Sequence, residues 1–365
     1  MDRATDPGLP LAGPASIAGH APGSVSVRVA DDADAAAWTA YVHAAPEATV
    51  YHAWAWRGIL AGAFGHRPHY LVARRGDSIV GVLPLARVRT LLFGDALVSL
   101  PFCPYAGPVA DDAAAARALD DAAVELGRAL GVQHLEYRGL RAGDRDWQRQ
   151  DGLYVLFRKP VSADHDANMN AIPRKQRAMV RKGIKFGLTS GPGTVDEFFE
   201  LHADNVHRHG TPPHAKRFFR MQIEALGPAA DILVVRDPAG RAVSGVLSLW
   251  HRDEVLPMHA GDLTAARDLA ANDFKYWELM RRAVDRGARV FNYGRSKVGT
   301  GPYDFKRNWG FEPQPLVYEY RLFKGDAIPQ HNPLNPKYQL MIRTWRKLPR
   351  FVVDRVGPVL VRGLG

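Results

Sequence analysis

The sequence predicts a mixed α/β protein made of two related domains in tandem, and internal repetition is the main reason. Leu71–Leu85 (LVARRGDSIVGVLPL) and Leu233–Leu249 (LVVRDPAGRAVSGVLSL) each predict a strand, a polar turn and a returning strand that contains G-V-L-x-L. Ala123–Gly139 and Met280–Arg295 each predict an amphipathic helix, a glycine near its end and a short strand with a tyrosine. A chain of 365 residues can hold two such cores. A generic pair of α+β domains fits the pattern as well.

The composition is that of a globular protein with an anionic partner. Hydrophobic residues make up 46% of the chain and charged residues 24%, and the net charge is +10 with a pI near 9.7. Such a charge favours tRNA, a phosphorylated or nucleotide-linked substrate, or an acidic membrane surface. The one cysteine, Cys103, excludes an internal disulfide framework and favours a reducing, cytoplasmic setting. We expect Cys103 to be a buried small residue.

The order of the segments gives the expected domain limits. The first 24 residues hold four prolines and four glycines without an apolar run, which predicts a flexible tail and not a signal peptide. No stretch approaches the roughly 18 apolar residues of a membrane span. Helices are expected at Ala33–Ala45 and Val195–Arg208, the second capped by Thr194 with Glu197. The expected parts are a tail (1–24), a first domain (25–157), a basic helical connector (158–189), a second domain (190–325) and a basic amphipathic tail (326–365).

The connector carries a basic stripe. Between Ile172 and Leu188 there is no acidic residue, and Arg174, Arg177, Arg181 and Lys185 recur at helical spacing. We expect Arg174, Arg177 and Arg181 to bind a phosphate-bearing ligand. A solvated helix face is the alternative.

The C-terminal tail combines apolar and basic residues. After the turn-rich NPLNPKY, the stretch from Tyr338 to Val361 alternates aromatic and aliphatic residues with arginines and lysine. Such a tail can cover a groove on its own protein or make peripheral contact with an acidic membrane. Pro349 and Pro358 interrupt the helical pattern and favour packing against the protein body.

The densest group of polar residues lies in the stretch from Val290 to Leu322. A strand ends in a turn, the glycine-rich GTG at 299–301 bends the chain, and Leu316–Leu322 predicts a half-buried edge strand. The bend should bring Phe305 and Lys306 back beside the first strand, with Tyr293 and Arg295 as the floor of a cleft and Phe305 and Trp309 as anchors. The polar residues near the strand ends are Arg295, Ser296, Tyr303, Asp304, Lys306 and Arg307. A strand pair with a solvated basic loop is the alternative.

These motifs carry a resemblance to a known family. F-N-Y-G-R-S followed by G-T-G-x-x-x-F-K-R-x-W-G-F-E-P-x-P-L resembles the C-terminal signature of FemAB-like proteins, in the branch associated with exosortase (PEP-CTERM) and exopolysaccharide gene clusters. The basic segment, HRHGTPPH (207–214) and ANDFKYWEL (271–279) extend the match, so it covers nearly all of the chain after the tail. The family is similar to the GNAT acyltransferase superfamily, with two such domains in tandem.

The resemblance implies a function and a set of site residues. Better-known members transfer amino acids from aminoacyl-tRNA to peptidoglycan precursors, so we expect an N-acyl or aminoacyl transferase that acts on a polysaccharide or nucleotide-sugar-linked envelope precursor. No cofactor should be bound, because the anionic donor, an aminoacyl-tRNA or an acyl thioester, is a co-substrate. Lys306 matches the family lysine at the reacting acyl group and would serve as an oxyanion or phosphate partner. Tyr303 and Asp304 are candidates for proton relay, and Asn272 in ANDFKYWEL for substrate binding.

Histidines provide further candidates. His259 and Asp262 follow the return strand of the second hairpin, where GNAT-like domains open toward the substrate, and a histidine there can act as a base. His207, His209 and His214 are accompanied by no cysteine and are separated by a TPP turn, so we do not expect a metal site.

Two departures from the family pattern bear on activity. Neither half has the Q/R-x-x-G-x-G/A loop of acetyl-CoA enzymes, which argues against an ordinary coenzyme A donor. Asn292 and Tyr293 stand where related strands have aspartate and phenylalanine, so this chain lacks any contribution that the family aspartate makes to activity. Two other functions stay open: acyl-CoA-dependent N-acylation of an amino sugar, and a non-catalytic RNA- or phosphate-binding protein of the same fold.

Overall fold

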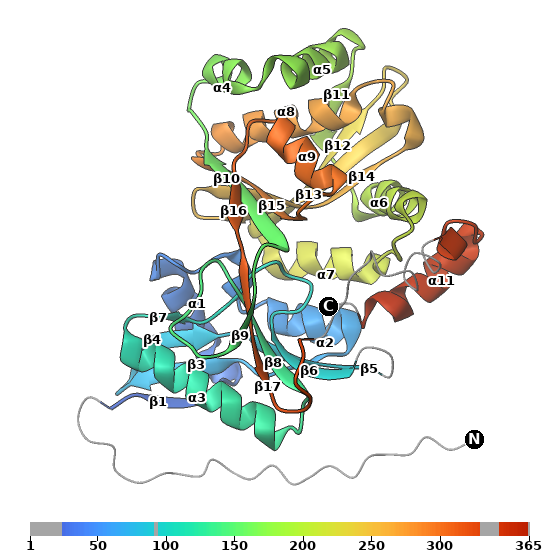
Figure 1. Ribbon diagram of the computed structural model, residues 1–365. Helices are drawn as coiled ribbons and strands as arrows, with labels where there is room; N and C mark the ends of the chain where they lie inside the picture. Colours follow the sequence, from blue (N-terminus) through green and yellow to red (C-terminus); the bar gives the residue numbers. More distant parts are fainter. Residues whose placement is uncertain (1–23, 91–93, 329–342, 364–365) are drawn as a thin grey trace.

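The protein consists of two α/β halves joined by a connector of two helices (Figure 1). The computed structural model describes residues 24–90, 94–328 and 343–363. The mixed α/β class and the tandem duplication predicted from the repeats are confirmed. The expected flexible tail lies, except for its last residue, outside the described residues, as do NPLNPKY and the first part of the C-terminal tail.

The strands of the first half form two sheets. Their orders are β1-β3-β4-β7 and β2-β5-β6-β8-β17-β9. Only Pro84 separates β4 from β5, and since proline has no N–H for a ladder hydrogen bond, the chain passes from one sheet to the other there. The strands are β1 (Ser26–Val29), β2 (Arg67–Pro68), β3 (Leu71–Arg75), β4 (Ser78–Leu83), β5 (Leu85–Thr90), β6 (Gly94–Ser99), β7 (Val109–Ala110), β8 (His134–Gly139), β9 (Gln148–Gln150) and β17 (Val317–Leu322).

The second half contains one sheet with the order β11-β12-β13-β14-β15-β10-β16. All of its pairs are antiparallel except β14 with β15, whose parallel register covers only Glu254 with Val290 and Val255 with Phe291. The two strands therefore separate toward their C-terminal ends. The strands are β10 (Tyr154–Pro160), β11 (Thr189–Pro192), β12 (Ala230–Arg236), β13 (Ala242–His251), β14 (Glu254–Asp262), β15 (Val290–Lys297) and β16 (Pro313–Pro315).

The two halves repeat one strand order. In the first half the series is β1, β3, β4 continued by β5, then β6, β8, β17 and β9. The matching series in the second half is β11, β12, β13, β14, β15, β10 and β16, so β4 and β5 together correspond to β13. The parallel pair β6–β8 takes the place of β14–β15. The two predicted hairpins, β3–β4 and β12–β13, occupy equivalent positions. Glycine recurs in both because a Cβ atom would lie 3.0 Å from Leu119 at Gly81 and 2.9 Å from Leu201 at Gly245.

Each half receives one strand from the other part of the sequence. β10 pairs with β15 and β16 in the second sheet, whereas β17 pairs with β8 and β9 in the first. The expected limits 25–157 and 190–325 need correction at these ends, and the strand expected at Leu316–Leu322 is interior, not an edge. Hydrophobic alternation identifies a strand but not its partner, so sequence order misplaced both.

The helices lie on both faces of the second sheet. α6 begins with the predicted capping box, in which Thr194 Oγ1 accepts from the Glu197 N–H over 3.2 Å and Glu197 Oε2 accepts from the Thr194 N–H over 2.9 Å. α4 and α5 form the connector and pack on α8. The α-helices are α1 (Ala35–Ala44), α2 (Trp56–Phe64), α3 (Ala113–Ala129), α4 (His165–Ala171), α5 (Arg174–Lys185), α6 (Val195–His209), α7 (Lys216–Leu226), α8 (Ala271–Asp285), α9 (Gly301–Asn308) and α11 (Arg350–Val361). The 3-10 helices are η1 (Asp32–Asp34), η2 (Val50–His52), η3 (Gly227–Ala229) and η4 (Thr264–Ala266).

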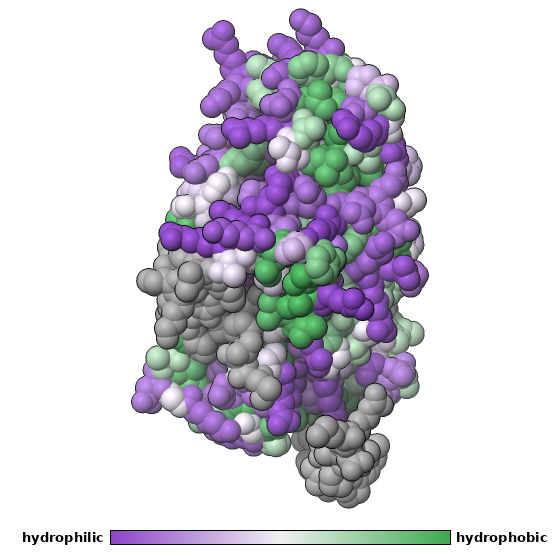
Figure 2. Space-filling view, turned by 90° about the vertical axis from the view of Figure 1, so that its right-hand side faces the viewer, coloured by the Kyte–Doolittle hydropathy of each residue, from purple (hydrophilic) through white to green (hydrophobic). Residues whose placement is uncertain are grey.

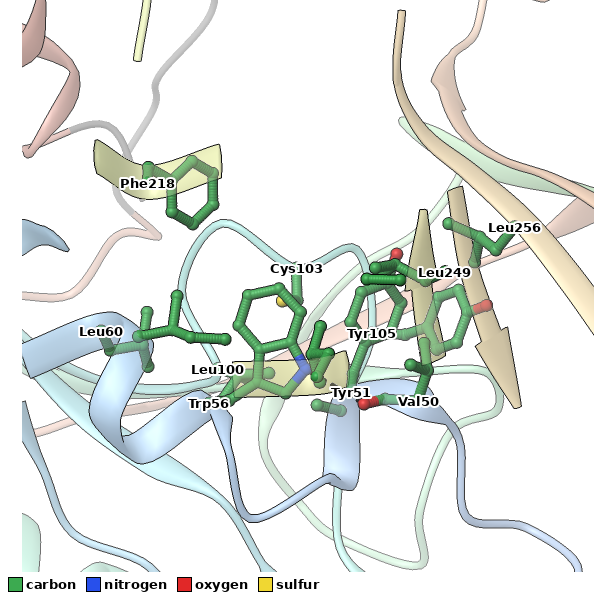
Figure 3. Close-up of a cluster of buried hydrophobic side chains, with 14 of the residues drawn as sticks. Val50, Tyr51, Trp56, Leu60, Leu100, Cys103, Tyr105, Phe218, Leu249 and Leu256 are labelled. Atoms are coloured by element: carbon green, nitrogen blue, oxygen red, sulfur yellow. Dashed lines mark hydrogen bonds between the residues drawn. The ribbon is translucent and has the colours of Figure 1, made fainter. Parts of the chain in front are cut away.

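One hydrophobic core is shared by the two halves. Figure 3 shows Tyr51, Trp56 and Tyr105 of the first half in the same cluster as Leu249 and Leu256 of the second. Cys103 is fully buried in this cluster, as expected. Burying one large apolar side chain stabilises the folded state by roughly 1.5–3 kcal/mol. A core of many such side chains from both halves therefore fixes the halves relative to each other.

The C-terminal helix α11 packs against the protein body. Val353, Gly357 and Val361 are buried, and a Cβ atom on Gly357 would lie 2.6 Å from Pro213. Pro349 precedes α11, but Pro358 lies inside it, so the expected interruption at Pro358 is wrong. Within the described ranges, no helix combines the length and the apolar character needed to cross a bilayer.

Candidate active site

A β-bulge in β15 directs Tyr293 and Arg295 toward different parts of the protein. Phe157 of β10 is paired with Gly294 and Arg158 with Asn292, so Tyr293 has no partner in the register, and Gly294 has a φ of +69°. A bulge with glycine in this conformation shifts the alternation of the strand by one residue. Tyr293 therefore lies in the core of the second half, whereas Arg295 faces the first half.

Tyr293 is thus not part of the cleft floor that the sequence predicts. Its side chain is only 3% exposed and packs among aromatic rings: Tyr276, Phe291, Phe305, Trp309 and Phe311. Ser296 is also buried, and its Oγ has no hydrogen-bond partner among the residues that the structure describes.

Asn292 joins the two halves at the buried end of β15. It is fully buried, and its Nδ2 donates to Tyr105 Oη over 2.7 Å and to Glu254 Oε1 over 2.6 Å. Its Oδ1 accepts from the N–H of Gly294 over 2.8 Å and so supports the bulge. An aspartate at this position would place a second carboxylate against Glu254, which explains why an amide fits this protein.

Lys306 returns to β15 as the glycine-rich bend predicts. Its Nζ donates to the main-chain carbonyl oxygens of Gly294 over 3.2 Å and Arg295 over 3.0 Å. Trp309, three residues on, is fully buried and donates from Nε1 to Asp273 over 2.9 Å, while Phe305 is half-buried against it. The helix α9 is therefore anchored by its aromatic side chains and presents Lys306 to the open end of β15.

The surroundings of Lys306 are cationic. Arg295 Nη1 donates to Tyr318 Oη over 2.6 Å, and its guanidinium lies 4.4 Å from the ring centre of Tyr154. No carboxylate within the described part of the chain pairs with Arg295. Burial, followed by repulsion from Arg295, lowers the pKa of Lys306 to about 7.

The other predicted residues of this segment lie at its periphery. Tyr303 is half-buried, with its ring centre 5.5 Å from that of Phe157, and the Arg307 guanidinium lies 5.7 Å from the Tyr303 ring. Asp304 and Arg307 are exposed in α9. The structure shows no hydrogen bond from Tyr303 or Asp304 to Lys306, so proton relay through them stays a prediction.

His259 and Asp262 lie on opposite faces of β14. His259 packs with His202, His214, Phe218 and Phe219, and burial lowers its pKa well below the ordinary value. Asp262 instead accepts from Lys275 Nζ over 2.8 Å and from Ser244 Oγ. The structure therefore does not bring these two candidates together, and a half-buried histidine packed among aromatic rings is poorly placed to act as a base.

A cavity of about 350 Å³ lies between α5, α6, the end of β14 and the start of α8. The predicted residues Asp262 and Asn272 line it, and so do Arg208, Arg267, Met179 and Phe305. The N-terminus of α8 opens beside it without a side-chain cap, with Ala270 at a φ of +55°. Phe305 of α9 lines this cavity, whereas the next residue, Lys306, does not.

Met179 of α5 lines this cavity, whereas the basic stripe lies on the other, solvent-facing side of the helix. Arg174 and Arg181 are exposed, and neither forms an ion pair with a described residue. Arg177 differs, because it is half-buried and donates to the carbonyl oxygen of Asn170 over 3.0 Å. The stripe is therefore a solvent-facing cationic surface, and none of its residues lines the cavity.

A larger cavity, of about 570 Å³, lies between the halves and was not predicted from the sequence. Tyr105, Tyr137 and His52 line it from the first half, and Arg158, Glu254 and Leu256 from the second. Lys306 and Arg295 do not line it. Its walls come from segments far apart in the sequence, so no local signal identified it.

The histidines of HRHGTPPH point to different surroundings. His207 Nε2 lies 3.3 Å from the carbonyl oxygen of Trp345, whereas His214 belongs to the buried cluster with His202 and His259. Among the residues that the structure describes, no group of His, Cys, Asp or Glu is arranged to hold a metal ion.

Comparison with known proteins gives one family match and several similar folds. Residues 167–307 match the family described as "Acetyltransferase (GNAT) domain". No curated protein matches the sequence significantly. The fold is similar to that of FemX, with a TM-score of 0.65 at 16% identity, over 87% of this chain and 100% of FemX.

Two further solved structures share the fold. L-PGS from Bacillus licheniformis matches with a TM-score of 0.55 at 13% identity, over 87% of this chain and 97% of that one. A tandem GNAT protein from the clavulanic acid biosynthesis pathway matches with a TM-score of 0.51 at 15% identity, over 83% of this chain and 100% of that one. Residues 167–307 thus match a GNAT acetyltransferase domain, and both halves of the chain have the GNAT fold.

Proposed function

We propose that the protein transfers an acyl or aminoacyl group directly to an amine on a polysaccharide or cell-envelope precursor. The observation that carries the proposal is Lys306, held at the open end of β15 beside Arg295, which no described carboxylate neutralises. A lysine with a pKa of about 7 can exchange a proton at neutral pH, and an unpaired guanidinium can hold an anionic part of a substrate.

The chemistry needs no covalent enzyme intermediate. The acceptor amine bonds to the acyl carbon of the donor, and neutral Lys306 accepts the proton that the amine loses. The acyl–oxygen or acyl–sulfur bond then breaks, and the released hydroxyl or thiol takes one proton. The two carbonyl oxygens of Gly294 and Arg295 accept hydrogen bonds from Lys306 and so orient its nitrogen. We propose this base role for Lys306 beside the oxyanion or phosphate role expected from the sequence, because half of the lysine is neutral at its pKa.

The cavity beside α8 and the stripe of α5 support an anionic donor. Arg208 and Arg267 line the cavity together with Asp262 and Asp273, and the N-terminal end of the α8 dipole favours negative charge. Arg174 and Arg181 extend the cationic surface outward, which suits a long polyanion such as the acceptor stem of an aminoacyl-tRNA. Arg177 contributes less, since it binds Asn170.

The acceptor class rests on the family resemblance and on similarity of fold. A putative lysylphosphatidylglycerol synthetase domain shares this fold, and its name refers to a phospholipid that carries an amino acid. The cavity between the halves is of a size that suits one sugar residue or a nucleoside. We propose that the acceptor is a polysaccharide or nucleotide-sugar-linked precursor, which the protein meets in the cytoplasm or at the inner membrane face.

A second candidate is an acyl-CoA-dependent N-acyltransferase of an amino sugar. The matched family is an acetyltransferase domain, and the cavity at the start of α8 would take a pyrophosphate as readily as a tRNA phosphate. The sequence lacks the glycine-rich loop that such enzymes use, so this candidate ranks second.

The test is to identify the donor and then measure transfer. Protein purified under native conditions is examined by mass spectrometry for bound aminoacyl-tRNA or acyl thioester, and each class is then supplied with an amino-sugar acceptor. Transfer from aminoacyl-tRNA supports the first proposal and transfer from acyl-CoA the second. Phosphate-ligand binding without transfer from either donor would contradict both.

A further inference from the structure

The outward face of α11 is apolar where a soluble helix is normally polar. Phe351 is 73% exposed and Val359 is 72% exposed, the two highest values among large hydrophobic side chains in the described ranges. Val356 is 42% exposed and Val352 is half-buried. Successive members of this set are one, four and three residues apart, which places all four within about 140° of the helix circumference and so on one side of α11.

The opposite side of α11 is the one that holds it to the protein. Val353, Gly357 and Val361 are buried there, and His66 Nε2 lies 2.9 Å from the carbonyl oxygen of Arg362. Arg350 adds an ion pair with Glu200 at 3.2 Å. α11 is therefore held to the protein by its other side, and its apolar face stays exposed while the helix is packed in place.

The same segment is strongly cationic. Residues 343–363 contain six arginines and lysines and one acidic residue, Asp354, which pairs with Arg350. Arg343, Lys347 and Arg355 are exposed and form no ion pair with a described carboxylate. Figure 2, which faces the side of the molecule where α11 lies, shows an apolar patch at mid-height bordered by hydrophilic residues.

We propose that this outward face, formed by Phe351, Val352, Val356 and Val359 with Arg355, docks the protein on an anionic phospholipid bilayer. Apolar side chains would enter the boundary between headgroups and acyl chains while the arginines pair with lipid phosphates. Charge decides between this occupant and another protein surface, because each cation near an anionic bilayer adds attraction whereas an apolar protein groove gains nothing from unpaired arginines. The proposal locates the transferase but does not rest on its activity.

The first experiment measures binding of the full chain to vesicles of phosphatidylcholine alone and with phosphatidylglycerol. We expect binding only to the anionic vesicles, with affinity that falls as salt rises. Phe351→Glu combined with Val359→Glu should weaken it at least about tenfold, since two apolar contacts become repulsive. Val29→Glu is the matched control, because Val29 is 47% exposed on β1 and should leave binding unchanged.

A second experiment reports depth and does not depend on the double variant. The protein has one cysteine, and Cys103 is buried, so Val359→Cys can be labelled alone with an environment-sensitive fluorophore. Anionic vesicles should shift its emission to the blue, whereas a label at Val29→Cys should not respond. Equal binding by the Glu variant, or absence of binding and of a fluorescence shift, would overturn the proposal. A dimer that the Glu variant dissociates, without vesicle binding, would also overturn it and assign the face to a second copy.

Discussion

Lys306 donates from Nζ to the main-chain carbonyl oxygen of Arg295 over 3.0 Å, so the residue proposed to move a proton is fixed by the residue proposed to bind charge. The contact spans eleven residues of the chain, from the bulge of β15 to α9. The side chains of the two residues then repel each other, which together with burial lowers the pKa of Lys306 to about 7. Position and protonation state therefore follow from the same local fold.

The rate of transfer should depend on pH through Lys306. As a base the lysine must be neutral, so single-turnover rates should rise as pH increases through about 7 and then level off. In Lys306→Arg the inflection should disappear, because arginine does not lose its proton. A rate that instead falls through pH 7 would show that the charged lysine is needed at the acyl oxygen.

Asn292→Asp should destabilise the protein at neutral pH. The new carboxylate would face Glu254, now 2.6 Å from the amide nitrogen, in a fully buried site, at a cost of about 1–3 kcal/mol in the free energy of unfolding. Denaturant unfolding measures the change. Adding Glu254→Gln should restore most of the loss, because an amide can donate to the new carboxylate. If Asn292→Asp alone is as stable as the parent, repulsion from Glu254 is not the reason for the amide at this position.

Reversing charge on α5 should weaken donor binding. Arg174→Glu with Arg181→Glu removes two exposed cations of the stripe, so affinity for tRNA should fall and its salt dependence should flatten by about one unit per lost phosphate contact. Arg117→Glu on α3, exposed and distant in the fold, controls for net charge. The same affinity and salt slope in the α5 variant and in the parent would mean that the stripe is only a solvated face.

The buried histidines should make the protein sensitive to acid. Burial lowers the pKa of His52 and His202 to about 4 and of His214 to about 3, from 6.5 in the unfolded chain. Between these values the unfolded state binds more protons, so the free energy of unfolding should decrease as pH falls from 6.5 toward 4. Thermal melts across this range measure the slope, and His214→Phe should reduce it. A melting temperature that is constant over this range would contradict these pKa directions.

Repetition and motif spacing predicted the fold class, the two hairpins and the return of Lys306 to β15, because these features depend on neighbours in sequence. Which sheet β10 and β17 join depends on which sheet has a strand free to pair with them. No local sequence pattern contains that information. The position of Tyr293 was missed because one glycine in the left-handed region reverses the alternation of a strand. His259 and Asp262 are three residues apart on β14, and the pleat sends their side chains to opposite faces.

The most direct test of the proposed mechanism is single-turnover transfer by Lys306→Ala with the identified donor. Loss of a general base should slow transfer on the order of a hundredfold or more while the thermal melt stays close to that of the parent. Lys324→Ala is the matched control, because Lys324 Nζ also donates to a main-chain carbonyl, that of Gly131 over 2.8 Å, but is exposed in the first half. Normal turnover in a folded Lys306→Ala protein would contradict the central claim and place the chemistry elsewhere.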